Sequence, residues 1–284
     1  MMSTFNFTWF LENCLPFISK LRNKVIVIKY GGAAMKNSHL QVQVMMDILF
    51  LFSLGIKVVL VHGGGPFIND WLNRLDIKSK FENGIRITDA KTMEVVEMVL
   101  AGKINKELVS LINVNNNIGV GLSGKDANLL LASNMFNDSN NLVGKIDFVN
   151  VKVLNLLLDN GYIPVIASVA SSCDLTTYNI NADTAAGAIA QALGAEKLVL
   201  LTDMPGILLD MNKPNSLQKQ LDSNSVKDLC EQNIISGGMI PKVQCCLHVL
   251  QHNVQTTHII DGRIEHSLLF ELLTNERIGS QIVL

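Results

Sequence analysis

Short runs of branched apolar residues alternate along this chain with longer segments whose apolar residues recur every three or four positions. The longer segments have the spacing of amphipathic helices, and the short runs are typical of strands buried inside a parallel sheet. Alternation of the two element types predicts a fold of the α/β class. The runs predict buried strands at 24–30, 57–61, 163–168, 197–202 and 256–260, with a closing strand at 278–284.

Helices are predicted between these strands. The helical spacing covers the residues before 24 and the ranges 39–54, 66–75, 89–112, 151–160, 184–193, 225–232, 238–252 and 266–273. In the helix at 39–54 we expect an inward face made of Val42, Met45, Met46, Leu49 and Phe50. Alternating residues at 77–88 predict a hairpin that turns at Asn83-Gly84, and small hairpins are also expected between 128 and 150.

The strand at 57–61 leads into a stretch that suits an anion-binding turn. His62 is followed by Gly63, Gly64 and Gly65, and then by Pro66. Glycine lets backbone N–H groups approach a ligand closely, and proline fits the first position of a helix. Free N–H groups and the positive end of the helix dipole would then point to one spot. A tight turn without a ligand is the alternative, although three consecutive glycines exceed what a turn needs.

Charged residues stand where neighbouring elements would reach the same edge of the sheet. Lys29 ends the first strand beside two glycines, at the carboxyl edge where α/β sheets bind ligands. Lys242 lies near a glycine-preceded helix N-terminus, where a bound anion would offset its charge. Asp183 falls in the first turn of a helix that Asn181 can cap. The functional alternative is that Asp183 and Asn179 face the same ligand edge as Lys29.

Arg86 lies between two isoleucines on the return strand of the predicted hairpin. A guanidinium group binds a carboxylate through two parallel hydrogen bonds, so one interpretation is a carboxylate clamp. An arginine that points outward to solvent fits the same pattern. This local pattern leaves both interpretations open.

Composition excludes several classes of protein. The chain has 284 residues, of which 48% are hydrophobic and 17% charged, and this suits one large α/β domain or two lobes. A net charge of −2 and an aromatic content of 6% argue against nucleic acid or an anionic membrane as a partner. Five cysteines without a C-x-x-C pair fit a reducing compartment and predict neither disulfides nor a metal site.

Targeting and membrane segments are not expected. No secretory signal is evident at the start of the chain. The apolar stretch 44–61 contains Asp47, Lys57 and a glycine break, so a helix followed by a strand is the better interpretation than a membrane span.

Two stretches resemble catalytic motifs but lack a required residue. Residues 119–125 nearly spell a P-loop, but Asp126 stands where a P-loop needs Ser or Thr to bind magnesium. Gly121-x-Ser123 lacks the second glycine of a nucleophile elbow. That absence argues against an acyl hydrolase, in which the His-Gly-Gly-Gly stretch would serve as an oxyanion loop.

Five motifs follow one another in order from the first strand onward. They are Lys29-Tyr30-Gly31-Gly32-Ala33-Ala34-Met35, Val61-His62-Gly63-Gly64-Gly65-Pro66, Asn83-Gly84-Ile85-Arg86-Ile87-Thr88-Asp89, Asn179-Ile180-Asn181-Ala182-Asp183 and Gly238-Met239-Ile240-Pro241-Lys242. Together they resemble the amino acid kinase family, and within it the branch that phosphorylates N-acetyl-L-glutamate. The resemblance runs from about Lys24 to the end of the chain.

The resemblance implies a three-layer αβα sandwich on a largely parallel central sheet, arranged as two lobes. It divides the chain into an N-terminal oligomerisation helix at 1–23, an acetylglutamate-binding lobe at 24–178 and an ATP-binding lobe at 179–284. The last of these would carry a C-terminal arginine-site segment.

An activity is also implied by the resemblance. MgATP, which brings the Mg²⁺ ion, would give its γ-phosphoryl group to the side-chain carboxylate of N-acetyl-L-glutamate, the second step of arginine synthesis. The implied catalytic residues are Lys29 and Lys242, which would flank the migrating phosphoryl group, and Asp183, which would hold both lysines. The implied substrate-binding residues are Gly64, Gly65, Arg86 and Asn179. We expect the nucleotide to contact Gly31, Gly32, Asp203 and Gly238.

Regulation by L-arginine follows from the same resemblance. The segment 266–279 is similar to the arginine site of the inhibited members. The resemblance assigns His266, Glu276 and Gly279 to that site. Arg277 departs from the pattern, because a glycine is usual at its position. Inhibited members are hexamers, trimers of dimers joined by N-terminal helices. Regulated members of cyanobacteria and plastids also bind the PII signalling protein, and no local feature of this chain decides that point.

Rival functions remain within the family and outside it. Glutamate 5-kinase, carbamate kinase, aspartokinase and uridylate kinase are the nearest rivals, and Arg86 with the run 179–183 favours the acetylglutamate branch. A non-catalytic arginine sensor is disfavoured because both lysines and Asp183 are present. The sequence fits a bacterial cytoplasm or a plastid stroma, and its many asparagines lean towards the plastid.

Overall fold

The computed structural model describes residues 7–82 and 85–284. A central sheet of eight strands runs through it, and six of its seven neighbouring pairs are parallel. Only β13 and β14 pair in the antiparallel sense. In spatial order the strands are β12 (Gln220–Asp222), β14 (Ser280–Val283), β13 (Thr256–Asp261), β11 (Lys197–Thr202), β1 (Val25–Tyr30), β2 (Lys57–His62), β8 (Ile163–Ala167) and β5 (Gly119–Ser123).

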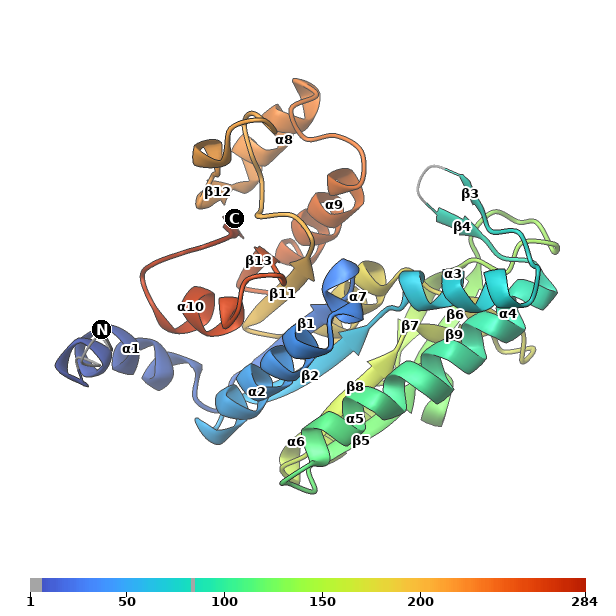
Figure 1. Ribbon diagram of the computed structural model, residues 1–284, viewed down its shortest axis with the longest axis horizontal. Helices are drawn as coiled ribbons and strands as arrows, with labels where there is room; N and C mark the ends of the chain where they lie inside the picture. Colours follow the sequence, from blue (N-terminus) through green and yellow to red (C-terminus); the bar gives the residue numbers. More distant parts are fainter. Residues whose placement is uncertain (1–6, 83–84) are drawn as a thin grey trace.

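Helices cover both faces of this sheet (Figure 1). Successive strand residues point to opposite faces, so Ile26 and Ile28 pack on one side while Val27 packs on the other. The Ile26 side holds α2 (Ser38–Ser53), α3 (Gly65–Arg74), α4 (Ala90–Glu97), α5 (Asn105–Asn113) and α10 (Ser267–Leu273). The Val27 side holds α6 (Lys152–Asp159), α7 (Ala182–Leu193), α8 (Ser223–Glu231) and α9 (Met239–Leu250). The expected three-layer αβα sandwich is therefore confirmed.

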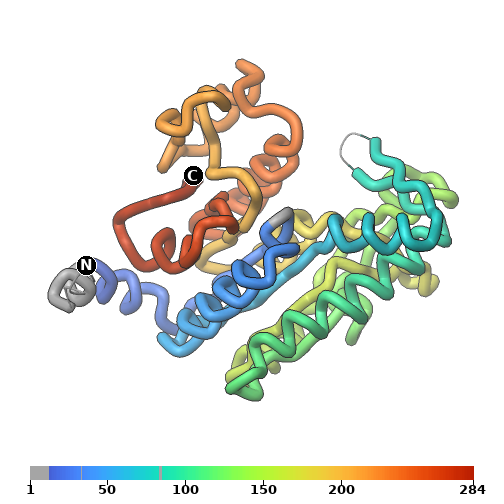
Figure 2. Tube along the Cα trace, viewed as in Figure 1, coloured from blue at the N-terminus to red at the C-terminus, as the bar shows by residue number. Residues whose placement is uncertain are grey.

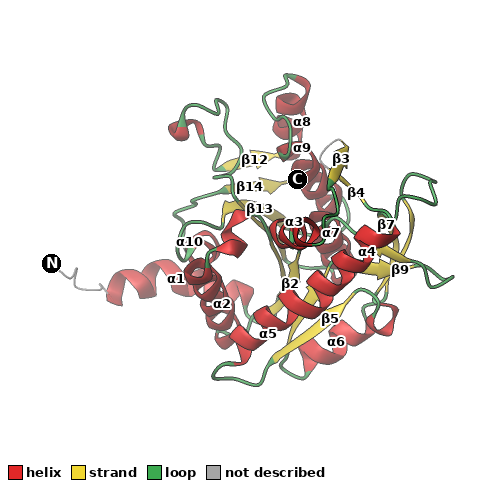
Figure 3. Cartoon of the chain, turned by 45° about the vertical axis from the view of Figure 1, so that its right-hand side comes forward, coloured by secondary structure: helices red, strands yellow, loops and turns green. Residues whose placement is uncertain are grey.

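Two smaller sheets lie at one end of the molecule (Figure 3). The four-stranded sheet contains β10 (Thr177–Asn179), β9 (Val169–Ser171), β6 (Leu130–Asn134) and β7 (Gly144–Val149). Its antiparallel β6–β7 pair confirms a hairpin between 128 and 150. The other sheet is the antiparallel pair β3 (Lys80–Glu82) and β4 (Ile85–Ile87), and the predicted turn at Asn83-Gly84 lies outside the described residues. Short 3₁₀ turns cover Ala33–Lys36, Asp126–Asn128 and Pro214–Ser216.

The inward face predicted for α2 is partly wrong. Met45 is buried, but Val42, Met46 and Phe50 have exposed fractions of 42%, 58% and 38%. Val44, Ile48 and Leu51 pack on the sheet with Met45 instead. Because this helix is apolar on most sides, helical periodicity could not identify which side faces the core.

Two further elements differ from the sequence prediction. The single helix predicted at 89–112 is α4 and α5 joined by a π-helical segment, Met98–Ile104. The residues 119–123, considered only as part of a failed motif, form strand β5 at the edge of the central sheet. Glycine weakens a strand pattern in sequence, but here Gly121 allows close packing, since a Cβ atom there would lie 2.2 Å from Asn105 Oδ1.

The predicted N-terminal helix is present as α1 (Phe7–Leu21), and it lies beside α10 at the edge of the molecule (Figures 1 and 2). Cys14 and Leu21 on this helix are buried. In the described part of the chain, no helix is both long and apolar enough to cross a membrane.

Candidate active site

The carboxyl ends of β1 and β2 bring the first two glycine motifs together. Tyr30 at the end of β1 is the register partner of His62 at the end of β2, and Gly63 N donates a hydrogen bond to Tyr30 O at 3.1 Å. Helix α3 begins at Gly65, and α7 begins beside the same loop, because a Cβ atom at Gly63 would lie 3.2 Å from Ala182 Cβ. Two helix N-termini therefore meet the carboxyl edge of the sheet, where α/β proteins bind ligands.

Asp183 joins two lysines from different parts of the chain. Its Oδ1 atom lies 2.9 Å from Lys29 Nζ, and its Oδ2 atom lies 2.7 Å from Lys242 Nζ. Lys29 comes from the end of β1 and Lys242 from the first turn of α9. Burial would raise the pKa of Asp183, but the charges of the two lysines outweigh burial and lower that pKa to about 2. The cluster thus holds one negative and two positive charges, a surplus of positive charge at a buried place.

Asn181 caps α7 as expected, since its side chain accepts hydrogen bonds from Asp183 N and Thr184 N. The cap leaves the Asp183 carboxylate free to bind the lysines. The capping interpretation is therefore confirmed for Asn181, and Asp183 lies beside Lys29, as the functional alternative expected of it.

The residues expected to contact the nucleotide lie around this cluster. A Cβ atom at Gly31 would lie 2.5 Å from Lys29 Nζ, so glycine leaves the room that the folded-back lysine occupies. Gly32 has φ of +81°, and a Cβ atom there would approach Asp203 N to 3.6 Å. Gly238 directly precedes α9 and is exposed. Gly31, Gly32 and Asp203 therefore lie close together, and Gly238 stands one turn before Lys242.

Arg86 is buried, so the outward-facing interpretation is wrong. Its Nη1 atom donates to Ser79 Oγ at 2.8 Å, and its Nη2 atom donates to Asn69 Oδ1 at 2.7 Å and to Gly65 O at 3.4 Å. Its guanidinium group also lies 4.7 Å from the centre of the Phe81 ring. No ion pair of the described residues includes Arg86, and burial lowers its pKa. A buried cation with only neutral partners is suited to an anionic ligand.

Asn179 is linked to Arg86 through Thr88. Asn179 Nδ2 donates to Thr88 Oγ1 at 3.1 Å, and Thr88 Oγ1 donates to Arg86 O at 2.9 Å. The structure therefore links Gly65, Arg86 and Asn179 by hydrogen bonds, and Gly64 directly precedes Gly65 in the chain.

The three residues assigned to an arginine site surround α10. His266 precedes this helix and lies 2.6 Å from Asp47 Oδ1 through its Nδ1 atom. Glu276 and Gly279 follow the helix, and Gly279 N donates to Glu271 Oε2 at 3.1 Å. His266 and Glu276 are thus at opposite ends of a helix that spans about 10 Å.

Sequence reasoning missed several residues that shape the site. Asn69 and Ser79 bind Arg86, and neither carried any motif signal. Asn105 contacts His62 from inside the core, and only the tertiary structure reveals this pair.

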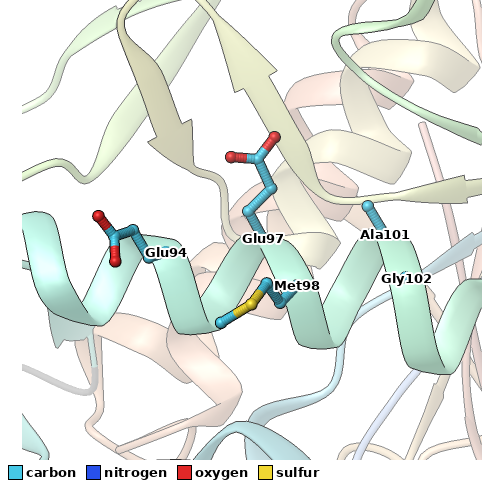
Figure 4. Close-up of a pocket in the computed structure, with 5 residues that line it drawn as sticks. All are labelled: Glu94, Glu97, Met98, Ala101 and Gly102. Atoms are coloured by element: carbon cyan, nitrogen blue, oxygen red, sulfur yellow. The ribbon is translucent and has the colours of Figure 1, made fainter.

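Other candidate sites are weaker. A shallow hollow on the outer side of α4 and the π-helical segment is lined by Glu94, Glu97, Met98, Ala101 and Gly102 (Figure 4). It includes none of the residues of the lysine cluster. Across residues 7–82 and 85–284, no group of three or more His, Cys, Asp and Glu side chains could hold a metal ion.

Comparison with known proteins agrees with this geometry. The model of the amino acid kinase family matches residues 24–261. An acetylglutamate kinase from Gracilaria tenuistipitata var. liui is 56% identical over 285 residues, which cover 100% of both chains. An acetylglutamate kinase from Nostoc sp. is 52% identical over 273 residues, which cover 96% of this chain and 92% of the relative.

Solved structures share the fold at lower identity. An N-acetylglutamate synthase from Neisseria gonorrhoeae, complexed with coenzyme A and N-acetyl-glutamate, has a TM-score of 0.86 at 24% identity. The match covers 98% of this chain and 64% of the synthase, so this chain spans less than two thirds of the synthase. A carbamate kinase from Giardia lamblia bound to AMP-PNP has a TM-score of 0.66 at 17% identity, covering 92% of this chain and 98% of the kinase.

The family match covers most of the chain, and the two acetylglutamate kinases align with it over nearly their whole lengths. The chain therefore belongs to the amino acid kinase family, within its acetylglutamate kinase branch.

Proposed function

We propose that Lys29, Lys242 and Asp183 carry the reaction of the acetylglutamate kinases, the ATP-dependent phosphorylation of N-acetyl-L-glutamate in arginine biosynthesis. The observation that carries this proposal is the ion-pair cluster itself. Two ammonium groups lie within 2.9 Å of one buried carboxylate, at the edge where two helix N-termini meet. Phosphoryl transfer needs aligned reactants and positive charge around the phosphoryl oxygens more than it needs covalent help.

The division of labour follows from the charges. Lys29 and Lys242 would lie on two sides of the migrating phosphoryl group and stabilise the charge that spreads over its oxygens. Asp183 would keep both ammonium groups in position while the substrates exchange. The side-chain carboxylate of the substrate is already a nucleophile at neutral pH, so the reaction needs no general base.

Substrate recognition would rest on the second cluster. Arg86 would bind the α-carboxylate of acetylglutamate, because it is a buried cation whose partners among the described residues are all neutral. Asn179 would contact the amide region, and the backbone N–H groups of Gly64 and Gly65 would receive the acceptor carboxylate. Gly31, Gly32, Asp203 and Gly238 would contact the nucleotide. Mg²⁺ would arrive with ATP and offset phosphate charge.

The predicted lobes fit this scheme. Residues 24–178 supply three of the four residues proposed for acetylglutamate, and Asn179 is the first residue of the second lobe. The residues proposed for ATP are divided equally, with Gly31 and Gly32 in the first lobe and Asp203 and Gly238 in the second. Lys29 belongs to the first lobe and Lys242 to the second, and Asp183 joins these two cations across the lobes.

ADP release tests this proposal with a panel of acids. We expect turnover with MgATP and N-acetyl-L-glutamate, and little turnover with glutamate, aspartate or carbamate. Free glutamate is the sharpest control because it differs only in the missing acetyl group. Activity confined to one of the other acids would assign the chain to a different branch of the family.

Feedback control is a second part of the proposal. We infer that L-arginine inhibits the enzyme by binding near His266, Glu276 and Gly279, beside the contact between α10 and α1. The N-acetylglutamate synthase from Neisseria gonorrhoeae, which shares the fold, has been solved with coenzyme A and L-arginine. We further propose a hexamer whose N-terminal helices join dimers, in a plastid stroma or a bacterial cytoplasm.

Two measurements test this control. Added L-arginine should suppress ADP release from the full chain, and a Glu276→Gln variant should need more arginine for the same inhibition. Light scattering should give six chains for the full protein and fewer for a version that begins at Asn23. An unchanged mass would contradict the role of α1. Mixing with the PII signalling protein in the same instrument tests for that partner.

A further inference from the structure

His62 is a buried titratable side chain to which the proposed reaction assigns no task. It ends β2 immediately before the three glycines, and its exposed fraction is 0%. Its Nδ1 atom lies 3.0 Å from Gly63 O, and its Nε2 atom lies 3.1 Å from Asn105 Nδ2. Both ring nitrogens are therefore engaged, one with the glycine loop and one with the core.

The partners of Asn105 fix which ring nitrogen carries the proton. Asn105 Nδ2 also lies 2.9 Å from Val165 O and 3.2 Å from Leu122 O, and both carbonyl oxygens can only accept. The amide nitrogen is thus a donor, so Nε2 of His62 must accept and Nδ1–H must donate to Gly63 O. Burial and the charge of Lys106 lower the pKa of His62, to about 4 despite its bond to Gly63, which keeps the ring neutral near pH 7.

The hydrogen bond to Gly63 O has a geometric consequence. In a trans peptide the C=O of one residue and the N–H of the next point in opposite directions. Because His62 holds the Gly63 carbonyl on its own side, the Gly64 N–H must point the other way. Gly64 caps α3 without a side chain, and its N–H is one of the two glycine donors proposed for the acceptor carboxylate.

The π-helical segment Met98–Ile104 holds this arrangement from the other side. A Cβ atom at Gly64 would lie 2.2 Å from Ile104 Cδ1 and 2.7 Å from Leu100 Cδ2, so the loop is pressed against the segment. Asn105 directly follows the segment, and its exposed fraction is 0%. The wider turn of a π-helix changes the phase of the residues that follow, and such insertions occur often at functional sites.

We propose that His62, oriented by Asn105, is a positioning residue that aims the Gly64 N–H at the acceptor carboxylate of the substrate. This inference rests on the proposed function and names a part of the same site. It separates the two ring nitrogens of His62: Nδ1–H sets the loop, and Nε2 only anchors the ring. Two conservative substitutions distinguish these tasks.

The test compares His62→Asn with His62→Gln. An asparagine amide can replace the Nδ1–H donor near the backbone, whereas a glutamine amide reaches the Nε2 position and loses the bond to Gly63 O. We expect kcat of His62→Asn to stay within several-fold of the wild type. We expect kcat of His62→Gln to fall by about 10- to 100-fold, as for a displaced oxyanion donor, with the KM for ATP unchanged.

A purely structural role predicts the opposite order. Glutamine is closer to histidine in volume, so it would fill the core better, and both kcat and thermal stability would follow volume. Equal kcat in the two variants, or lower kcat in His62→Asn, would overturn the proposal. If neither histidine variant folds, Asn105→Leu takes their place. It should lower kcat at least about tenfold at an unchanged KM for ATP, and unchanged kcat would overturn the inference.

Failure of the proposed function gives a different result. The wild-type protein is assayed first with MgATP and N-acetyl-L-glutamate. No turnover in the wild type would reject the function itself, whatever the variants do. Normal turnover in the wild type together with full activity of His62→Gln would reject only the positioning role.

Discussion

Removal of the charge on Asp183 is the most informative perturbation of this protein. In Asp183→Asn the side chain keeps its shape, but Lys29 and Lys242 lose their shared counter-charge. At an effective dielectric constant near 20, the two separations of 2.9 and 2.7 Å correspond to about 6 kcal/mol of attraction each. Desolvation offsets most of that attraction, because the pKa of Asp183 falls only from 3.8 to about 2. The net contribution of the charge is therefore about 2–3 kcal/mol.

We expect Asp183→Asn to unfold about 3–5 °C lower than the wild type and to lose about 100-fold in kcat, because both lysines are then free to move. Differential scanning calorimetry and ADP release measure the two effects. MgATP should stabilise the variant more than the wild type, since the phosphates would replace the missing negative charge. The depressed pKa means that this contribution is present above pH 3.8 and is lost as the pH falls through 2.

Asp222→Asn is the matched control. Asp222 caps α8 by accepting hydrogen bonds from two backbone N–H groups, and asparagine caps helices equally well. Its kcat and unfolding temperature should stay near those of the wild type. If Asp183→Asn kept wild-type kcat, or lost stability without losing activity, the assignment of Asp183 to the chemistry would be refuted.

Three further predictions follow from the same geometry. Lys29→Ala or Lys242→Ala should lower kcat by about 100-fold or more and leave both KM values within a few-fold, and near-normal kcat would remove that lysine from the reaction. Arg86→Lys should raise the KM for acetylglutamate about tenfold with little effect on the KM for ATP, because an ammonium group cannot replace the planar fork. Burial outweighs the Glu271 carboxylate, which lies 2.8 Å from His258 Nδ1, and lowers the pKa of His258 from 6.5 to about 4. Between these values the unfolded chain therefore binds a proton that the folded chain does not. The free energy of unfolding should therefore fall as the pH drops from 6.5 towards 4. In urea unfolding, His258→Gln should reduce that total fall by up to about 3 kcal/mol. Parallel curves of unfolding free energy against pH for the two proteins would contradict this cause.

The sequence was sufficient for the features that depend on short stretches. Buried parallel strands are continuous apolar runs, so β1, β2, β8, β11 and β13 were predictable from local pattern. Glycine turns at the ends of β1 and β2 pointed to the edge of the sheet where Asp183 joins the two lysines. The cap made by Asn181 followed from its position before an alanine-rich helix.

Features decided by tertiary packing were not predictable. The π-helical segment changes the phase of the helix before Asn105, and Asn105 contacts His62. No local sequence pattern predicts this change of phase. Strand β5 was missed because its glycines serve close packing and carry no strand signal. The outer face of α2 was misassigned because Val42, Met46 and Phe50 are as apolar as the residues that pack on the sheet.

The partners of Arg86 show the same limit. The sequence left a clamp and a solvent-facing side chain equally open, and the choice depended on Asn69 and Ser79, which approach from other elements. Only the folded chain shows that this cation is buried and has no carboxylate partner among the described residues.

Transfer of an isotopic label tests the central claim most directly. N-Acetyl-L-glutamate carrying ¹⁸O in its side-chain carboxylate is incubated with the enzyme and MgATP, and the product is cleaved with hydroxylamine, which attacks the acyl carbon and releases phosphate. If the carboxylate oxygen attacks the γ-phosphorus, each phosphate released from the product should contain one ¹⁸O atom by mass spectrometry. Unlabelled phosphate would mean that water or another group had attacked, and it would contradict the assignment of this site to carboxylate phosphorylation.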